Sequence, residues 1–89
     1  MLKVIKFEAE WCGPCLQMRP LFEEVIAAYK ENPAIRIEVH NVDTAAELTI
    51  KYNITSIPAL VFEKDGEVVS RMVGFRGKAE ITKEIENFI

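Results

Sequence analysis

The chain has 89 residues, of which 49% are hydrophobic and 28% are charged, and its formal net charge is −3 at pH 7. This length and hydrophobic content suffice for one compact core, so we expect a single domain over residues 1–89. The scattered basic residues argue against nucleic-acid binding, no apolar run reaches the roughly 20 residues of a membrane span, and MLKVIKFEAEW lacks the apolar core of a secretory signal, which favours a cytoplasmic protein.

The first half of the chain predicts two strands joined by a helix. Residues 2–7 are rich in β-branched and aromatic side chains, which predicts a first strand. From Gly13 onward, apolar residues recur at helical spacing and predict a helix of roughly five turns that ends at Asn32 and Pro33. Residues 35–40 alternate apolar and polar side chains, as in a second strand. Because a helix connects them, the two strands should be parallel.

The second half predicts a short helix, a hairpin and a last helix. A Thr-x-x-Glu capping box opens a short helix over residues 44–52. Residues 59–63 and 67–73 flank a Lys-Asp-Gly turn, a strong signal for an antiparallel hairpin. An apolar stripe that ends at Ile89 predicts a C-terminal helix.

These elements follow the order β-α-β-α-β-β-α. Pairing the hairpin against the first strand gives an α/β fold with a four-stranded mixed sheet of order 2-1-3-4, flanked by three helices. The first helix then starts at the end of a central strand. Open α/β sheets tend to place their sites at such a point.

The only two cysteines lie in EAEWCGPCLQM, residues 8–18. A structural disulfide across so short a loop removes little entropy from the unfolded chain, and a reducing cytosol would open it. Tetrahedral zinc needs four ligands, more than two cysteines and His40 supply, so we expect no metal site. An iron–sulfur cluster shared between two subunits satisfies the ligand count, but nothing else in the sequence supports one.

Thiol–disulfide exchange explains why each residue of the Cys-Gly-Pro-Cys segment is present. The start of a helix offers partial positive charge and free N–H groups, which stabilise a thiolate. Cys12, just before the first turn, is expected to be exposed and to attack a partner disulfide. Cys15, one turn in and more buried, would then attack Cys12 and release the reduced partner. Gly13 and Pro14 hold the pair close, and the fixed φ of proline limits how far the loop relaxes.

The combination of WCGPC, a later Ile-Pro and a Val-Gly after the next strand is very specific, and on it the chain resembles the thioredoxin family. The resemblance extends over nearly the whole chain. The matching residues are Phe7, Ala9, Glu10, Trp11, Cys12, Gly13, Pro14, Cys15, Pro20, Asn41, Asp43, Lys51, Tyr52, Ile57, Pro58, Gly66, Glu67, Val73 and Gly74. The N-terminal strand and helix of full-length thioredoxins have no counterpart, so the chain looks like a minimal thioredoxin fold.

The resemblance implies a thiol–disulfide oxidoreductase that reduces disulfides in partner proteins. It would act as a monomer, use no cofactor beyond its own dithiol, and be recharged by a thioredoxin reductase or an equivalent enzyme. It also implies a cis bond before Pro58 and an apolar rim, formed by Trp11, Ile57, Pro58, Gly74 and Phe75, that docks partners. Taken alone, Pro58 could simply begin a strand, and Trp11 and Phe75 could be core residues.

One departure from the family concerns Lys6. Thioredoxins usually carry a buried Asp at this position, six residues before the first cysteine, and its usual Lys partner aligns here with Val39. Lys6 either snorkels to the surface without a role or lowers the thiolate pKa, which would make the protein more oxidising than a standard thioredoxin. Glu8, where a Trp is usual, and His40 are further candidates for proton transfer, but we expect both to be solvated or structural.

Other functions remain as alternatives. An oxidase or isomerase would be favoured by a secretory precursor, and a non-redox docking subunit would use the apolar rim alone. Glutaredoxin-like, glutathione-dependent exchange is disfavoured because Gly13 and Pro14 stand where glutaredoxins carry Pro-Tyr, and no basic glutathione pocket is recognisable.

Overall fold

The computed structural model describes all of residues 1–89. The elements in chain order are β1 (Leu2–Glu8), α1 (Gly13–Ala27), β2 (Ile35–Asn41), α2 (Ala46–Lys51), β3 (Ala59–Lys64), β4 (Glu67–Val73) and α3 (Lys78–Phe88). The strands form one four-stranded sheet of order β2-β1-β3-β4. β1 is parallel to β2 and antiparallel to β3, and β3 is antiparallel to β4. The predicted element order, strand directions and sheet order are confirmed.

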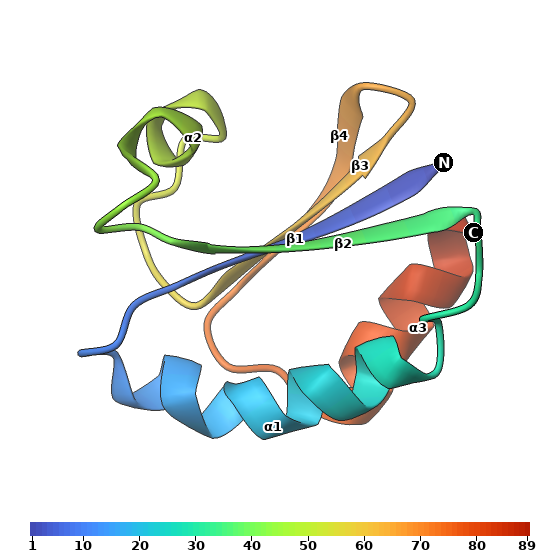
Figure 1. Cartoon of the computed structure of the whole chain (residues 1–89), viewed down its shortest axis with the longest axis horizontal. Helices are drawn as coiled ribbons and strands as arrows, with labels where there is room; N and C mark the ends of the chain where they lie inside the picture. The colour runs from blue at the N-terminus through green and yellow to red at the C-terminus, as the bar shows by residue number, and fades with distance from the viewer.

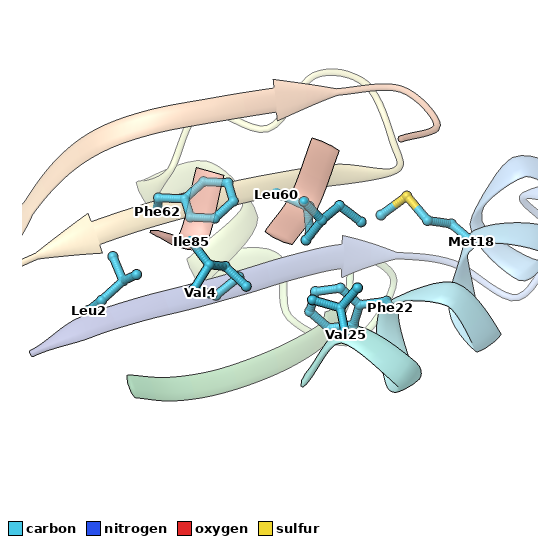
Figure 2. Packing of buried hydrophobic residues seen from close by; sticks show 9 residues of the cluster. Leu2, Val4, Met18, Phe22, Val25, Leu60, Phe62 and Ile85 are labelled. Atoms are coloured by element: carbon cyan, nitrogen blue, oxygen red, sulfur yellow. The ribbon is translucent and has the colours of Figure 1, made fainter. Parts of the chain in front are cut away.

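Helices cover both faces of the sheet, with α1 and α3 packed together on one face and α2 on the other (Figure 1). The larger core lies under α1 and α3 and comprises Leu2, Val4, Met18, Phe22, Val25, Leu60, Phe62, Ile81 and Ile85. Figure 2 shows its α1 side chains pointing toward those of β1 and β3. The core on the α2 face comprises Ile5, Phe7, Tyr52, Ala59 and Val61. Successive β1 residues thus pack on opposite faces, as the period of a strand requires.

Three strands extend one residue beyond their predicted ends, and the larger differences from the predicted boundaries concern two helices. α1 has 15 residues, about four turns, because hydrogen bonds between residues three apart tighten the chain just after Ala27. The predicted capping box does not form: α2 begins at Ala46, and its N-cap, Ala45, makes no side-chain hydrogen bond. The Thr44 hydroxyl instead donates to the carbonyl oxygen of Asn41 at 3.3 Å, in the turn that follows β2.

The end of β1 positions the functional segment. Because β1 and β2 are parallel, both finish at the same edge of the sheet, and the Val42 N–H donates to the Glu8 carbonyl oxygen at 2.9 Å to hold the two ends together. The chain then crosses from the sheet to the start of α1 through residues 9–12. No helix of the structure is both long and apolar enough to span a bilayer.

Candidate redox-active site

The two cysteines sit at the start of α1. Cys12 is the N-cap residue and Cys15 lies in the first turn, with Pro14 at one of the first helical positions. Their Cα atoms are 5.2 Å apart and their sulfur atoms form a disulfide. The Cys15 N–H donates to Cys12 Sγ at 3.2 Å, so the helix N-terminus directs a backbone donor at this sulfur. That contact favours the Cys12 thiolate when the disulfide is reduced.

The two sulfur-bearing residues differ in exposure, although less than the sequence suggests. Cys15 is 0% exposed and Cys12 is 6% exposed. Cys12 is therefore the more accessible one, as predicted, but it is buried in the disulfide form, where an exposed residue was expected. The reason is local packing: both cysteines cluster with Ala9, against Val42 and Ile57.

The loop before β3 reaches the cysteines from the other side. The Ile57–Pro58 peptide bond is cis, as the resemblance implies. Ile57 is half-buried and packs on the cysteine cluster, while Pro58 is buried. The N–H of Gly74 donates to the Pro58 carbonyl oxygen at 2.8 Å and ties the end of β4 to this loop. Gly74 has φ +92°, in the left-handed region that favours glycine.

Two large aromatic side chains, next in the chain to Cys12 and to Gly74, face solvent. Trp11 is 69% exposed and Phe75 is 47% exposed, so the interpretation of either as a core residue is wrong. The indole N–H of Trp11 donates to Asp43 Oδ2 at 2.9 Å, which orients the ring. Trp11 also lines a small pocket of about 140 Å³ together with Ile57. Of the predicted rim residues, Ile57 thus packs on the cysteines and Gly74 is bonded to Pro58, while Trp11 and Phe75 follow as exposed neighbours of Cys12 and Gly74 in the chain.

Lys6 and Glu8 are the only buried charged residues, at 0% and 7% exposure. Lys6 Nζ lies 2.8 Å from Glu8 Oε1 and 5.4 Å from the centroid of the Phe22 ring. Glu8 Oε2 accepts from Arg19 Nη2 at 2.7 Å, and Arg19 also reaches the exposed Glu10 at 3.3 Å. The alternative of a Lys6 that snorkels to the surface is wrong, and of the two roles expected for Glu8 the solvated one is wrong, because Glu8 is buried in an ion pair. Lys6 lies on a central strand beneath α1, and its ammonium is paired with a carboxylate on the same strand.

The neighbouring cations decide the ionisation of Glu8. Burial alone raises the pKa of Glu8, but the close contacts and positive charges of Lys6 and Arg19 outweigh it and hold the pKa below 4.5. The same carboxylate raises the pKa of Arg19. The buried group is therefore a carboxylate held between two cations at neutral pH.

Arg19 was missed by the sequence interpretation, although it follows Cys15 by one helical turn and thus shares its side of α1. His40 does not join this cluster. It lies on the α2 face of the sheet, 5.9 Å from Phe7 between ring centroids, and pairs with Glu38 at 2.9 Å. The structure holds no group of three or more His, Cys, Asp or Glu side chains that could hold a metal ion.

An α/β fold that carries a Cys-x-x-Cys pair at a helix N-terminus, opposite a cis-proline loop, defines a thiol–disulfide exchange protein. Comparison with known proteins identifies the family. The thioredoxin family model matches residues 1–87. Thioredoxin from Mycoplasmoides gallisepticum is 38% identical over 78 residues, which cover 88% of this chain and 75% of that protein. Thioredoxin from Listeria monocytogenes is 35% identical over 88 residues, which cover 99% of this chain and 84% of that protein.

Solved structures agree with the sequence relatives. Oxidised mitochondrial thioredoxin 3 from Saccharomyces cerevisiae has a TM-score of 0.85 at 30% identity, covering 98% of this chain and 78% of that one. Oxidised thioredoxin from Plasmodium falciparum has a TM-score of 0.82 at 33% identity, covering 98% of this chain and 80% of that one. The chain belongs to the thioredoxin family. It is a thiol–disulfide oxidoreductase, and Cys12 and Cys15 form its Cys-x-x-Cys pair.

Proposed function

We propose that this protein is a disulfide reductase: its dithiol form reduces disulfides in partner proteins, and a thioredoxin reductase or an equivalent enzyme restores the dithiol. The observation that carries the proposal is the position of Cys12 at the N-cap of α1, where its sulfur accepts the Cys15 N–H at 3.2 Å. A thiolate at this position is the nucleophile that disulfide exchange requires.

The difference in burial supports a division of roles between the cysteines. The Cys12 thiolate attacks one sulfur of the partner disulfide, that S–S bond breaks, and the other partner sulfur leaves as a thiolate and takes up a proton. Cys15, which is 0% exposed, is out of reach of a bulky partner but adjacent to Cys12. It loses its proton, attacks Cys12 Sγ, and expels the second partner sulfur, which is protonated in turn. The partner gains two electrons and two protons, and the Cys12–Cys15 disulfide forms.

We propose that the rim of Trp11, Ile57, Pro58, Gly74 and Phe75 docks the partner. The exposed Trp11 and Phe75 offer apolar contact area to a partner. The backbone N–H and C=O of Ile57 make no hydrogen bond within the chain, although the residue lies just before β3. An extended partner segment can pair with these free groups in the manner of an added strand.

Two serine variants test this proposal. Cys15→Ser retains the nucleophile but cannot resolve the mixed disulfide, so it should accumulate covalent complexes with a disulfide-bonded protein such as insulin. Cys12→Ser should form none, and both variants should lose multiple-turnover reductase activity. Mass spectrometry of the adducts is the measurement. Equal trapping by both variants, or turnover by the Cys12→Ser variant, would overturn the assignment.

Further parts of the proposal concern the protein as a whole. We propose that residues 1–89 act as one monomeric thioredoxin-like domain, and that the cytoplasm, whose reducing poise supplies electrons to such a dithiol, is its compartment. No cofactor is required, because the electrons reside in the dithiol itself.

We also propose Lys6 as a residue that tunes the thiol pKa, since its buried ammonium lies on the strand that leads into the cysteine segment.

A further inference from the structure

Lys6, Glu8 and Arg19 form what we term the charge triad. Glu8 is its centre, because one carboxylate oxygen lies 2.8 Å from Lys6 and the other 2.7 Å from Arg19. The side chain of Lys6 is 1% exposed and that of Glu8 is 10% exposed, whereas that of Arg19 is 34% exposed. Neither Lys6 Nζ nor Glu8 Oε1 makes a hydrogen bond of regular geometry, so the two groups are joined as an ion pair by proximity. A second copy of this arrangement does not occur in the chain, since no other charged residue is buried.

Two members of the charge triad lie close to the cysteines along the chain. Glu8 immediately precedes Ala9, which packs directly on Cys12 and Cys15. Arg19 follows Cys15 by four residues on α1, so their Cβ atoms are about 5–6 Å apart. A buried charge, such as that of Lys6, acts on nearby groups with less screening by water than an exposed one.

The charge triad lines a pocket of about 270 Å³ between α1 and the edge strand β2. The other charged residue that lines it is Glu23 of α1, while β2 contributes only the apolar Val39. Glu10 contacts Arg19 from the loop before α1. None of the rim residues lines this pocket. A partner seated on the rim would therefore leave the triad's own opening free.

We propose that Lys6, Glu8 and Arg19 are positioning residues for the redox reaction, and that their net charge sets how readily the cysteine pair forms its thiolate. This inference rests on the proposed function and extends it from the cysteine loop to the layer beneath it. Two cations and one carboxylate leave the triad with a net charge of +1. A positive charge near a thiol stabilises its ionised form.

The proposal predicts changes of opposite sign for neighbouring substitutions. Glu8→Gln raises the net charge to +2 and should increase the acid dissociation constant of the nucleophilic thiol on the order of tenfold, one pKa unit. Lys6→Met lowers the net charge to zero and should decrease that constant by a similar factor. Arg19→Met should act as Lys6→Met does but more weakly, because its charge is partly solvated.

The double variant Lys6→Met/Glu8→Gln separates electrostatics from packing. It retains Arg19 and a net charge of +1, so its thiol should ionise close to the unsubstituted protein. If the residues act only by filling space, the double variant should be at least as perturbed as either single one. In the single variant Glu8→Gln, Lys6 is buried without its carboxylate partner, and that protein could fail to fold. The double variant has no such lysine, so the double variant and Arg19→Met still test the proposal in that case.

The measurement is the ultraviolet absorbance of the thiolate as a function of pH, on the reduced full chain without a partner. The reduction potential of the Cys12–Cys15 couple should rise by about 30 mV for each tenfold gain in the equilibrium constant of the dithiol over the disulfide. The matched control is Glu24→Gln and Lys78→Met, singly and together. These residues form a pair of the same kind at 2.7 Å, but their side chains are 62% and 55% exposed, and both thiol readouts should stay unchanged.

The possible outcomes distinguish failure of the charge-triad proposal from failure of the proposed reductase function. Single substitutions that move the thiol constant in the same direction, or leave it unmoved in a folded protein, would overturn the role of the charge triad. Reductase activity of the unsubstituted protein would then still support the proposed function. Opposite shifts in a protein that reduces no partner disulfide would support the triad's electrostatic role and refute the reductase assignment.

Discussion

On the face of the sheet that α1 and α3 cover, one end of β1 carries apolar side chains and the other end carries charged ones. Leu2 and Val4 face α1 and α3 from one end and join a core with no polar side chain (Figure 2). Lys6 continues the same alternation at the other end, where its ammonium pairs with Glu8 and lies over the ring of Phe22. α3 contributes Ile81 and Ile85 to the apolar end. The comparison indicates that the apolar end supplies stability, while the charged end, beside the cysteines, is adapted to chemistry.

The largest expected effect lies at the apolar end. Phe62→Ala removes a side chain that is 0% exposed, and it should lower the free energy of unfolding by about 3–5 kcal/mol, because the cavity cannot fully close. Urea denaturation of the oxidised protein measures this loss. The thiol acidity of the reduced protein should stay unchanged wherever the variant is folded. A loss below about 1 kcal/mol would show that this end is not the main source of stability.

Stability at the charged end should depend on charge balance instead of volume. Glu8→Gln leaves Lys6 buried against a neutral amide, and it should cost about 3 kcal/mol, because breaking a buried ion pair leaves one charge uncompensated. Lys6→Met/Glu8→Gln should recover most of that loss, since both charges of the pair are removed. Denaturant midpoints of the three proteins give the comparison. A double variant less stable than Glu8→Gln would contradict it.

The same carboxylate gives the charged end an acid dependence. The pKa of Glu8 is lower in the folded protein than its ordinary value of 4.5, so the unfolded chain binds the proton first as the pH falls. The contribution of Glu8 is therefore complete above the ordinary value and is lost as the pH falls through the folded pKa. Unfolding free energies measured from neutral pH downward should show a smaller loss in Lys6→Met/Glu8→Gln. Parallel curves for the two proteins would refute this origin of the acid sensitivity.

On the opposite face of the sheet, Tyr52 gives a smaller effect of the other sign. Burial, followed by the hydrogen bond to Glu63, raises its pKa from 10.0 to about 12, so its contribution is complete below pH 10 and is lost as the pH rises toward 12. Tyr52→Phe removes this dependence and should cost about 1 kcal/mol at neutral pH, through the lost hydrogen bond. Base titration of unfolding, compared between the two proteins, is the measurement. An unchanged alkaline limb in Tyr52→Phe would assign that limb to other groups.

The sequence was sufficient for the fold and for the cysteine pair because both rest on local signals. Strand alternation, helical spacing and the hairpin turn are each encoded within a few residues, and Cys12 and Cys15 lie within one turn of one helix. The charge triad was not predictable in this way. Lys6, Glu8 and Arg19 meet only because β1 and α1 pack against each other, and a lysine on a strand reads as a solvated residue until a carboxylate is placed beside it.

The smallest expected effect tests whether burial is what distinguishes the charge triad. Lys78 and Glu24 connect α3 to α1 at 2.7 Å, as short as the Arg19–Glu8 contact, but they are mostly exposed. Solvent screening and side-chain entropy offset most of the attraction, so Lys78→Met or Glu24→Gln should change the unfolding free energy by at most about 1 kcal/mol. A double-mutant cycle in denaturant measures the coupling. If it equals that of Lys6 and Glu8, distance alone would set the strength of these pairs, and the contrast between the two ends of β1 would lose its physical basis.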